Sequence, residues 1–256
     1  GELALEKRGL VLICGRTSSG KSTSLAAMVD FRNQTTGGHI ITIEDPIEYY
    51  HEHKMGIVTQ REIGIDTESY SNALKNALRQ KPDVIMVGEI RDPEVMQQSI
   101  IASETGHLCY ATLHTTSASQ AVERIIDFFP EERHQQIRVA LAMNLRAIVA
   151  QRLVHSTKGG MVVVLEILLN EALVKDLILK GDLTKIRDVM ANNNAAGMVT
   201  FDQSLLSHYK NGIISEETAI AEADLPTDMK IRILQVRMNQ TGKGNMPDID
   251  TSKLSL

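Results

Sequence analysis

Short apolar runs alternate with segments of helical periodicity over the first two-thirds of the chain. In the helical segments apolar residues recur every three or four positions, and the runs between them are four to eight residues long. This alternation is typical of an α/β fold with a mainly parallel sheet covered on both faces. We predict strands over residues 10–14, 39–43, 84–87, 108–113 and 161–168. We predict helices over residues 22–31, 69–80, 93–104, 118–128 and 131–150.

Two regions depart from this alternation. Residues 48–65 show no helical period, and the alternation at residues 57–59 predicts a hairpin or an extra strand. After Asn170 only helical periods occur, which predicts helices over residues 172–180, 183–192, 201–210 and 227–239. We therefore expect one domain over residues 1–240, with a helical part at 170–240 and a flexible polar tail at 241–256.

One loop between a predicted strand and a predicted helix has the spacing of a nucleotide-phosphate site. It matches the pattern G-x-x-x-x-G-K-S from Gly15 to Ser22. In such a loop backbone N–H groups bind phosphate oxygens, the lysine contacts the β and γ phosphates, and the serine hydroxyl binds Mg²⁺. Nucleotide contacts are predicted for Gly15, Thr17, Ser18, Ser19, Gly20, Lys21, Ser22 and Thr23.

Acidic residues follow two other predicted strands. Glu44 and Asp45 end the strand at 39–43, and Glu89 follows the strand at 84–87. Ligands of open α/β sheets bind at the carboxyl ends of strands, so these acids are placed to order Mg²⁺ and to activate water beside the phosphates. A single acid at a strand end is more often a solvated loop residue or a helix cap. Two such acids beside a phosphate loop favour the functional interpretation.

Two histidines bracket the strand at 108–113. His114 stands at the carboxyl end, where it could donate a hydrogen bond to the γ phosphate and sense its loss. His107 lies seven residues earlier, on the opposite face of an extended strand, so a metal shared by the two rings is not expected.

The composition restricts the class of partner. The formal net charge is −5, aromatic residues make up 4% of the chain and tryptophan is absent. Nucleic-acid-binding domains usually carry a basic excess and aromatic stacking platforms, so we expect no nucleic-acid partner. The two cysteines indicate a reducing compartment such as the cytoplasm, and no apolar run has the length of a membrane span, so no direct membrane insertion is expected.

Four segments together resemble the ATPases of type IV pili in the secretion superfamily. They are the phosphate loop, the acidic box at 42–48, the strand end at 87–92 and the histidine box at 104–118. The resemblance covers residues 8–215 and is greatest to the retraction motors of the PilT/PilU family, especially the PilU type. It implies a RecA-like P-loop core that uses ATP and Mg²⁺. By this resemblance Lys21 and Ser22 bind phosphate and Mg²⁺, Glu44 is the general base, Glu89 is the Walker B acid, and His107 and His114 form the histidine box.

The resemblance also implies an assembly. Members are similar in forming homo-hexameric rings at the cytoplasmic face of the inner membrane, where the pilus platform protein and a partner retraction ATPase ring are expected partners. Arg61 and Arg79 match family arginines that could cross a subunit boundary to the nucleotide. An equally weighted alternative is that both form surface ion pairs.

Four features distinguish this chain from other members of that superfamily. Cys14 and Cys109 cannot form the four-cysteine zinc element of the extension motors, which favours retraction. The segment 172–178 differs from the matching PilT segment, which favours an accessory, PilU-like motor. The PAS-like domain that precedes the core in the family is expected to be absent from this chain. Ser18 occupies a loop position where relatives often have glycine, so positive φ there would strain it.

Three functions remain open from the sequence. The first is an ATP-hydrolysing ring motor that drives or assists pilus retraction. The second is an ATP-binding coupling subunit that docks on a partner motor without generating force. The third is a nucleic-acid motor with the same core, which salt-sensitive DNA binding would support.

Overall fold

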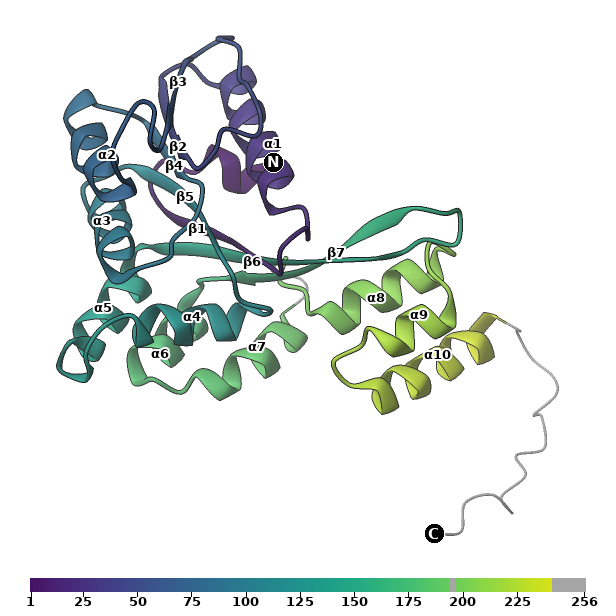
Figure 1. Cartoon of the computed structure of the whole chain (residues 1–256). Coiled ribbons are helices and arrows are strands. Elements are labelled where there is room, and N and C mark those ends of the chain that lie inside the picture. The colour runs from purple at the N-terminus through teal and green to yellow at the C-terminus, as the bar shows by residue number, and fades with distance from the viewer. Residues whose placement is uncertain (194–196, 241–256) are drawn as a thin grey trace.

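A computed structural model describes residues 1–193 and 197–240. Its centre is one seven-stranded sheet with the order β3-β2-β4-β5-β1-β6-β7 (Figure 1). All neighbouring pairs are parallel except β6 and β7. The strands are β1 (Gly9–Cys14), β2 (His39–Glu44), β3 (Ile57–Glu62), β4 (Val84–Val87), β5 (Leu108–Leu113), β6 (Leu145–His155) and β7 (Met161–Leu169). The predicted mainly parallel α/β architecture is confirmed.

Helices cover both faces of the sheet. The helices of the core are α1 (Lys21–Thr35), α2 (Tyr70–Ala77), α3 (Pro93–Glu104), α4 (Ala118–Asp127) and α5 (His134–Asn144). Short 3₁₀ turns lie at Glu2–Leu5, Leu78–Gln80, Glu131–Arg133 and Leu183–Lys185. Alternate residues of each strand point to opposite faces, so Leu10 and Leu12 pack in one core, and Val11 and Ile13 pack under α1 in the other.

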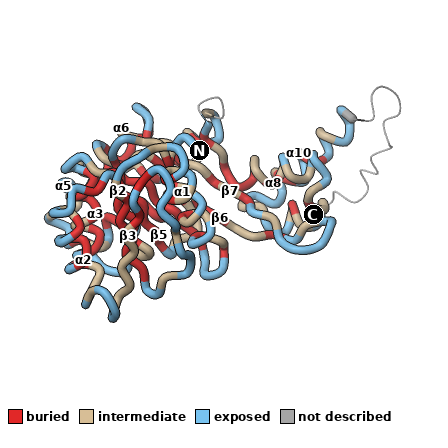
Figure 2. Tube along the Cα trace, turned by 90° about the horizontal axis from the view of Figure 1, so that it is seen from above, coloured by how far each residue is buried: buried red, intermediate tan, exposed pale blue. Residues whose placement is uncertain are grey.

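The carboxyl ends of the parallel strands position the candidate site. β1, β2, β4 and β5 run in one direction, so the residues that follow them meet at the same edge of the sheet. Buried positions concentrate along this sheet in Figure 2, whereas the region around α10 is mostly exposed or intermediate. The site is therefore built on the most buried part of the chain.

The predicted helix over residues 131–150 is wrong from residue 145 onward. Helix α5 ends at Asn144, and β6 begins at Leu145. The Asn170 side-chain amide donates to the carbonyl oxygens of Ala142 (3.0 Å) and Leu145 (2.9 Å), which satisfies groups left open at the helix end. Pairing with β1 and β7 then overrides the helical period of the local sequence, because a helix there would leave β1 as an edge strand paired on one side only.

The extra strand predicted at residues 57–59 is β3, and it runs parallel to β2. A hairpin would have made the pair antiparallel, so that alternative is wrong. The segment 45–56 carries the chain back to the start of the sheet, and its end is held by the Met55 N–H, which donates to the Asn33 carbonyl (3.0 Å). The segment therefore crosses beside α1 before β3 begins.

The C-terminal helices lie below the β6–β7 ribbon in Figure 1. They are α6 (Ala172–Lys180), α7 (Ile186–Asn192), α8 (Phe201–Lys210), α9 (Glu216–Ala221) and α10 (Pro226–Gln240). The sequence predicts all of these except α9, whose six residues are too few to show a period. The predicted tail at 241–256 lies outside the described residues.

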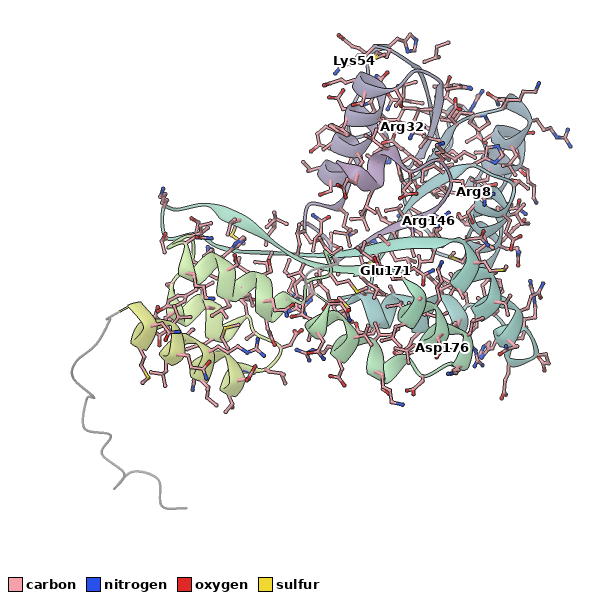
Figure 3. All side chains as sticks on the ribbon, turned by 180° about the vertical axis from the view of Figure 1, so that it is seen from behind. Arg8, Arg32, Lys54, Arg146, Glu171 and Asp176 are labelled. Carbon is pink, nitrogen blue, oxygen red and sulfur yellow. The ribbon has the colours of Figure 1, made fainter. Side chains whose placement is uncertain are left out.

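The opposite edge of the sheet, away from the strand tips, is held by arginines. Arg146 Nε donates to the Arg8 carbonyl (3.0 Å), and the two residues lie together below Arg32 in Figure 3. Arg32 donates to the carbonyl of Glu6 (2.9 Å) in the N-terminal segment. None of the helices in the described ranges combines the length and apolar character of a membrane span.

Candidate functional site

The phosphate loop connects β1 to α1 and depends on two glycines. Gly15 has φ of +152°, and a Cβ there would lie 2.3 Å from Ser19 Oγ and 2.7 Å from the Gln151 carbonyl oxygen. Gly20 has φ of +89° and is the N-cap of α1. Glycine meets both conditions without strain. The loop can therefore approach β6 closely while the first N–H groups of α1 stay available for an anion.

Ser18 has φ of +62°, so the positive φ anticipated from the sequence is present. A non-glycine residue in this region costs about 1–2 kcal/mol. Strain of this kind persists where the surrounding structure fixes the backbone, as it does at many ligand sites. The Ser18 side chain is exposed and lines the cavity described below.

Lys21 and Ser19 supply groups that fit a phosphate. Lys21 Nζ donates to the carbonyl oxygens of Gly15 (2.9 Å) and Arg16 (3.0 Å), which holds the ammonium over the loop. Burial lowers the pKa of Lys21, and the nearby carboxylate of Glu89 opposes this shift. Ser19 Oγ is buried and has no hydrogen-bond partner among the described residues. Phosphate oxygens accept hydrogen bonds from such groups.

Glu44 ends β2 as a buried carboxylate with 7% exposure. Its Oε1 accepts hydrogen bonds from Thr42 Oγ1 (2.6 Å) and Gln60 Nε2 (3.1 Å). Thr42 and Gln60 face each other across the β2–β3 register. The two donors therefore come from rigid strands and fix the direction of the carboxylate, as a general base requires.

Glu89 follows β4 and has two cationic or potentially cationic partners. Its Oε2 lies 2.7 Å from the Arg91 guanidinium, and its Oε1 lies 2.9 Å from His114 Nε2. Arg91 also lies 3.7 Å from Asp45. The loop backbone is fixed from β5, where Thr112 Oγ1 donates to the Gly88 carbonyl (2.5 Å). The predicted Walker B acid and the predicted γ-phosphate sensor are thus in direct contact.

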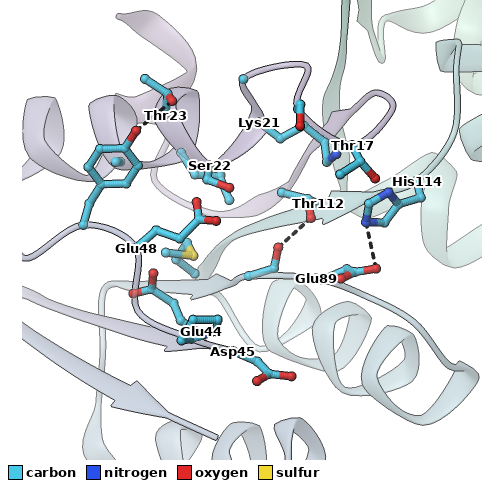
Figure 4. Close-up of a pocket in the computed structure, with 18 of the residues that line it drawn as sticks. Thr17, Lys21, Ser22, Thr23, Glu44, Asp45, Glu48, Glu89, Thr112 and His114 are labelled. Atoms are coloured by element: carbon cyan, nitrogen blue, oxygen red, sulfur yellow. Dashed lines mark hydrogen bonds and ion pairs between the residues drawn. The ribbon is translucent and has the colours of Figure 1, made fainter.

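These side chains line one polar cavity of about 660 Å³. In Figure 4 Lys21 and Ser22 face Glu44 and Glu89 across it. Among the residues predicted from the sequence, those that line the cavity are Thr17, Ser18, Gly20, Lys21, Ser22, Thr23, Glu44, Asp45, Glu89 and His114. Gly15 and Ser19 belong to the same loop but do not line this cavity. The cavity brings the phosphate loop, both acids and the carboxyl-end histidine together.

Three residues with predicted roles lie elsewhere in the described structure. His107 precedes β5, at the end of the strand opposite His114, and its Nδ1 lies 3.1 Å from the Ala102 carbonyl oxygen. Arg61 is half-buried on the edge strand β3, and Arg79 is exposed after α2. None of the three lines the cavity of this single chain. The roles of all three at a nucleotide remain predictions. For Arg61 and Arg79 the prediction concerns the nucleotide of a neighbouring subunit.

Comparison with known proteins places the chain in a family. The profile of the family described as Type II/IV secretion system protein matches residues 2–161. The chain belongs to this family. Among curated relatives, it is 54% identical over 233 residues to "Type IV pilus ATPase PilU" of Pseudomonas aeruginosa, which covers 91% of this chain and 61% of that protein. It is 43% identical over 219 residues to "Type IV pilus retractation ATPase PilT" of the same organism, with 86% and 64% covered.

A solved structure agrees with this assignment. The structure titled "Crystal Structure of the Pilus Retraction Motor PilT and Bound ADP" matches with a TM-score of 0.84 and 43% identity, covering 90% of this chain and 65% of that chain. The sequence resemblance to the PilT/PilU family is therefore confirmed. This Type II/IV secretion system protein spans about three-fifths of the length of the curated relatives that it matches.

Sequence reasoning assigned no role to three residues that this family member brings to the cavity or its wall. Arg91 contacts Glu89, Gln60 contacts Glu44, and Tyr49 lines the cavity and bonds to Thr23. Arg91 stands two residues after Glu89, and this spacing could have predicted their contact. Gln60 could have been found only by pairing β3 in parallel with β2, since that register sets it opposite Thr42.

Proposed function

We propose that this chain is the motor region of an ATPase that drives or assists retraction of a type IV pilus. The single observation that carries the proposal is the meeting of Lys21, Glu44, Glu89 and His114 at one cavity. The similarity to the ADP-bound PilT structure supports a nucleotide as the ligand. The complete set of phosphate-loop and acidic residues favours hydrolysis over a docking role without catalysis.

Each residue is proposed to act at one part of the nucleotide. Lys21 and the N–H groups of the first turn of α1 bind the phosphates, and Glu44 accepts a proton from the attacking water. Glu89 holds His114 at the same edge, where its ring can donate to the terminal phosphate. Ser22 and Glu89 would hold Mg²⁺, which neutralises phosphate charge when bound. Hydroxyl and carboxylate oxygens are the ligands that Mg²⁺ prefers.

The assembly is part of the same proposal. We propose a homo-hexamer at the cytoplasmic face of the inner membrane, attached through the pilus platform protein and working with a partner retraction ATPase ring. Arg61 and Arg79 lie outside the cavity, with Arg79 exposed and Arg61 on the edge strand. Both positions are compatible with reaching the nucleotide of a neighbouring subunit. Such arginines stabilise charge that develops during phosphoryl transfer.

Loss of the Lys21 ammonium tests this function. In the full-length protein, Lys21→Ala is expected to weaken ATP binding by roughly 2–5 kcal/mol, because a buried charge pair with phosphate is lost. This is about thirtyfold or more in Kd, and hydrolysis should fall with it. Lys158→Ala, at an exposed lysine in the β6–β7 turn, is the control. Unchanged ATP hydrolysis by Lys21→Ala would reject the proposed function.

A further inference from the structure

A single amide connects Glu44 to the segment that crosses beside α1. Gln60 Nε2 donates to Glu44 Oε1 (3.1 Å) and to the Tyr49 carbonyl oxygen (2.8 Å). Gln60 Oε1 accepts from the His51 N–H (2.8 Å). Both amide hydrogens and the amide oxygen are thus in use. A flipped amide would place its oxygen against a carboxylate and a carbonyl, so these neighbours determine its orientation.

A second contact connects the same segment to the phosphate loop. Tyr49 Oη lies 2.9 Å from Thr23 Oγ1, at hydrogen-bond distance, and Thr23 directly follows Ser22 in the first turn of α1 (Figure 4). Both side chains line the cavity. Tyr49 therefore contributes its carbonyl to Gln60 and its hydroxyl to α1, so that one residue joins the strand-held acid to the phosphate-binding turn.

We propose that Gln60 and Tyr49 are positioning residues that set the distance between Glu44 and the phosphate loop. The inference rests on the proposed ATPase function and assigns two residues to that site. Without these contacts, the described hydrogen bonds and ion pairs that join the residues after Glu44 to α1 lie farther along the helix, at Asp30 and Asn33. Lys54 Nζ pairs with Asp30, and the Asn33 side chain contacts Glu52, Lys54 and Gly56. Gln60 and Tyr49 instead hold the segment at the phosphate end of α1.

The size of the effect follows from the demands on a general base. A base must lie within hydrogen-bond reach of the water that it activates, about 2.6–3.2 Å. A misplacement of about 1 Å can cost roughly a hundredfold in rate. Phosphate binding, in contrast, depends on Lys21 and the backbone of the loop. Loss of either positioning contact should therefore lower the turnover rate while nucleotide affinity changes little.

Single substitutions in the full-length protein test this expectation. Gln60→Leu removes the amide at similar volume, and Tyr49→Phe removes one oxygen while the ring remains. Each is expected to lower kcat for ATP hydrolysis roughly tenfold or more, with ATP Kd within about twofold. Tyr50→Phe is the matched control, because Tyr50 is the next residue, is 86% exposed and does not line the cavity. It should leave both constants unchanged.

A double-substitution cycle separates positioning from general damage to the fold. If Gln60 acts through Glu44, Gln60→Leu should have little further effect on single-turnover hydrolysis once Glu44→Gln is present. Equal loss in both backgrounds would overturn the proposal, since the effect would not pass through Glu44. Tyr49→Phe keeps the test decisive if Gln60→Leu does not fold, because it deletes one hydroxyl only.

The possible outcomes distinguish failure of the positioning role from failure of the proposed ATPase function. One outcome would overturn the positioning role alone: the wild type hydrolyses ATP, Glu44→Gln does not, and both Gln60→Leu and Tyr49→Phe still do. Absence of hydrolysis by the wild type would overturn both proposals. A drop in kcat at constant Kd, confined to Gln60 and Tyr49 and absent from Tyr50→Phe, supports the positioning role.

Discussion

Glu44 and Glu166 are both buried carboxylates, yet their surroundings differ. Glu44 is 7% exposed, accepts hydrogen bonds from two side chains and lines the large polar cavity. Glu166 in β7 is 4% exposed and accepts a hydrogen bond from the Ala118 N–H at the start of α4 (2.7 Å). Burial raises the pKa of Glu166 above its ordinary value of 4.5. The first acid lines the candidate site, whereas the second holds the start of α4 against β7.

The surroundings of Glu166 extend this contrast. Arg152 lies 2.8 Å from Asp224, and Arg187 lies 3.0 Å from Asp202 and 3.5 Å from Asp224. The Asp224 N–H donates to Asp202 Oδ1 (2.7 Å). We call these four residues the C-terminal joint. Its charges pair with one another, so the joint attaches the C-terminal helices to the β6–β7 ribbon. Arg152, Arg187 and Asp224 also line a smaller cavity of about 250 Å³ together with Glu166.

The largest expected effect separates the two acids by activity. Glu44→Gln removes the proposed base while the amide can still accept from Thr42, so ATP hydrolysis is expected to fall roughly 10²–10⁴-fold with little change in Tm. Glu166→Gln should retain most hydrolysis at low temperature. Steady-state hydrolysis by both full-length variants provides the measurement. Equal loss of activity in the two variants would remove the distinction between a site acid and a structural acid.

The second effect concerns stability at the C-terminal joint. Asp202→Ala leaves Arg187 with one carboxylate fewer and the Asp224 N–H without its acceptor. A cost of about 2–3 kcal/mol in the free energy of unfolding is expected, because lost buried hydrogen bonds to charged groups cost this much. Asp202→Asn keeps the acceptor oxygen and should cost less. Urea unfolding measures both, and a neutral Asp202→Ala would show that the joint contributes little.

The third effect is a pH dependence. The raised pKa of Glu166 favours the protonated carboxyl in the folded protein, so its contribution to stability is full below pH 4.5 and is lost as pH rises through the folded pKa. Glu166→Gln has no such loss. The Tm of Glu166→Gln relative to wild type should therefore rise between pH 4.5 and pH 7.5. A Tm difference independent of pH would contradict the assignment.

The smallest effect lies in the phosphate loop. Ser18→Gly removes a strain of about 1–2 kcal/mol but adds about 0.5–1 kcal/mol of chain entropy to the unfolded state. The net gain is about 0.5–1 kcal/mol, which corresponds to a Tm rise of about 1–4 °C. Thermal unfolding monitored by circular dichroism measures it. A lower Tm for Ser18→Gly would mean that the serine side chain stabilises the loop.

The sequence predicts the ligand side of this comparison much better than the joint. The phosphate loop, Glu44, Glu89 and His114 follow predicted strands, and the rule that parallel strands end at one edge brings them together. The contacts of Gln60 depend on the parallel register of β2 and β3, which no local pattern specifies. For His107 the sequence motif is misleading. The histidine box spans the whole of β5, so its two histidines lie at opposite ends of that strand.

The joint was invisible to sequence reasoning for a related reason. The segment after Asn144 has a helical period but forms β6, because pairing with β1 and β7 outweighs local preference. Arg152 and Glu166 come near each other only through the antiparallel β6–β7 register, which pairs Arg152 with Val164 and Glu166 with Ala150. Without that ribbon, no spacing along the chain connects these residues to Asp202 or Asp224.

The most direct measurement is a structure of the full-length protein with Mg²⁺ and a nonhydrolysable ATP analogue. The account predicts that Lys21 contacts the β and γ phosphates and that Glu44 lies within hydrogen-bond reach of the water in line with the γ phosphorus, directly or through one further water. Glu89 and His114 should remain in contact beside the same phosphate. Glu44 and Glu89 far from the γ phosphate in every subunit would contradict the account.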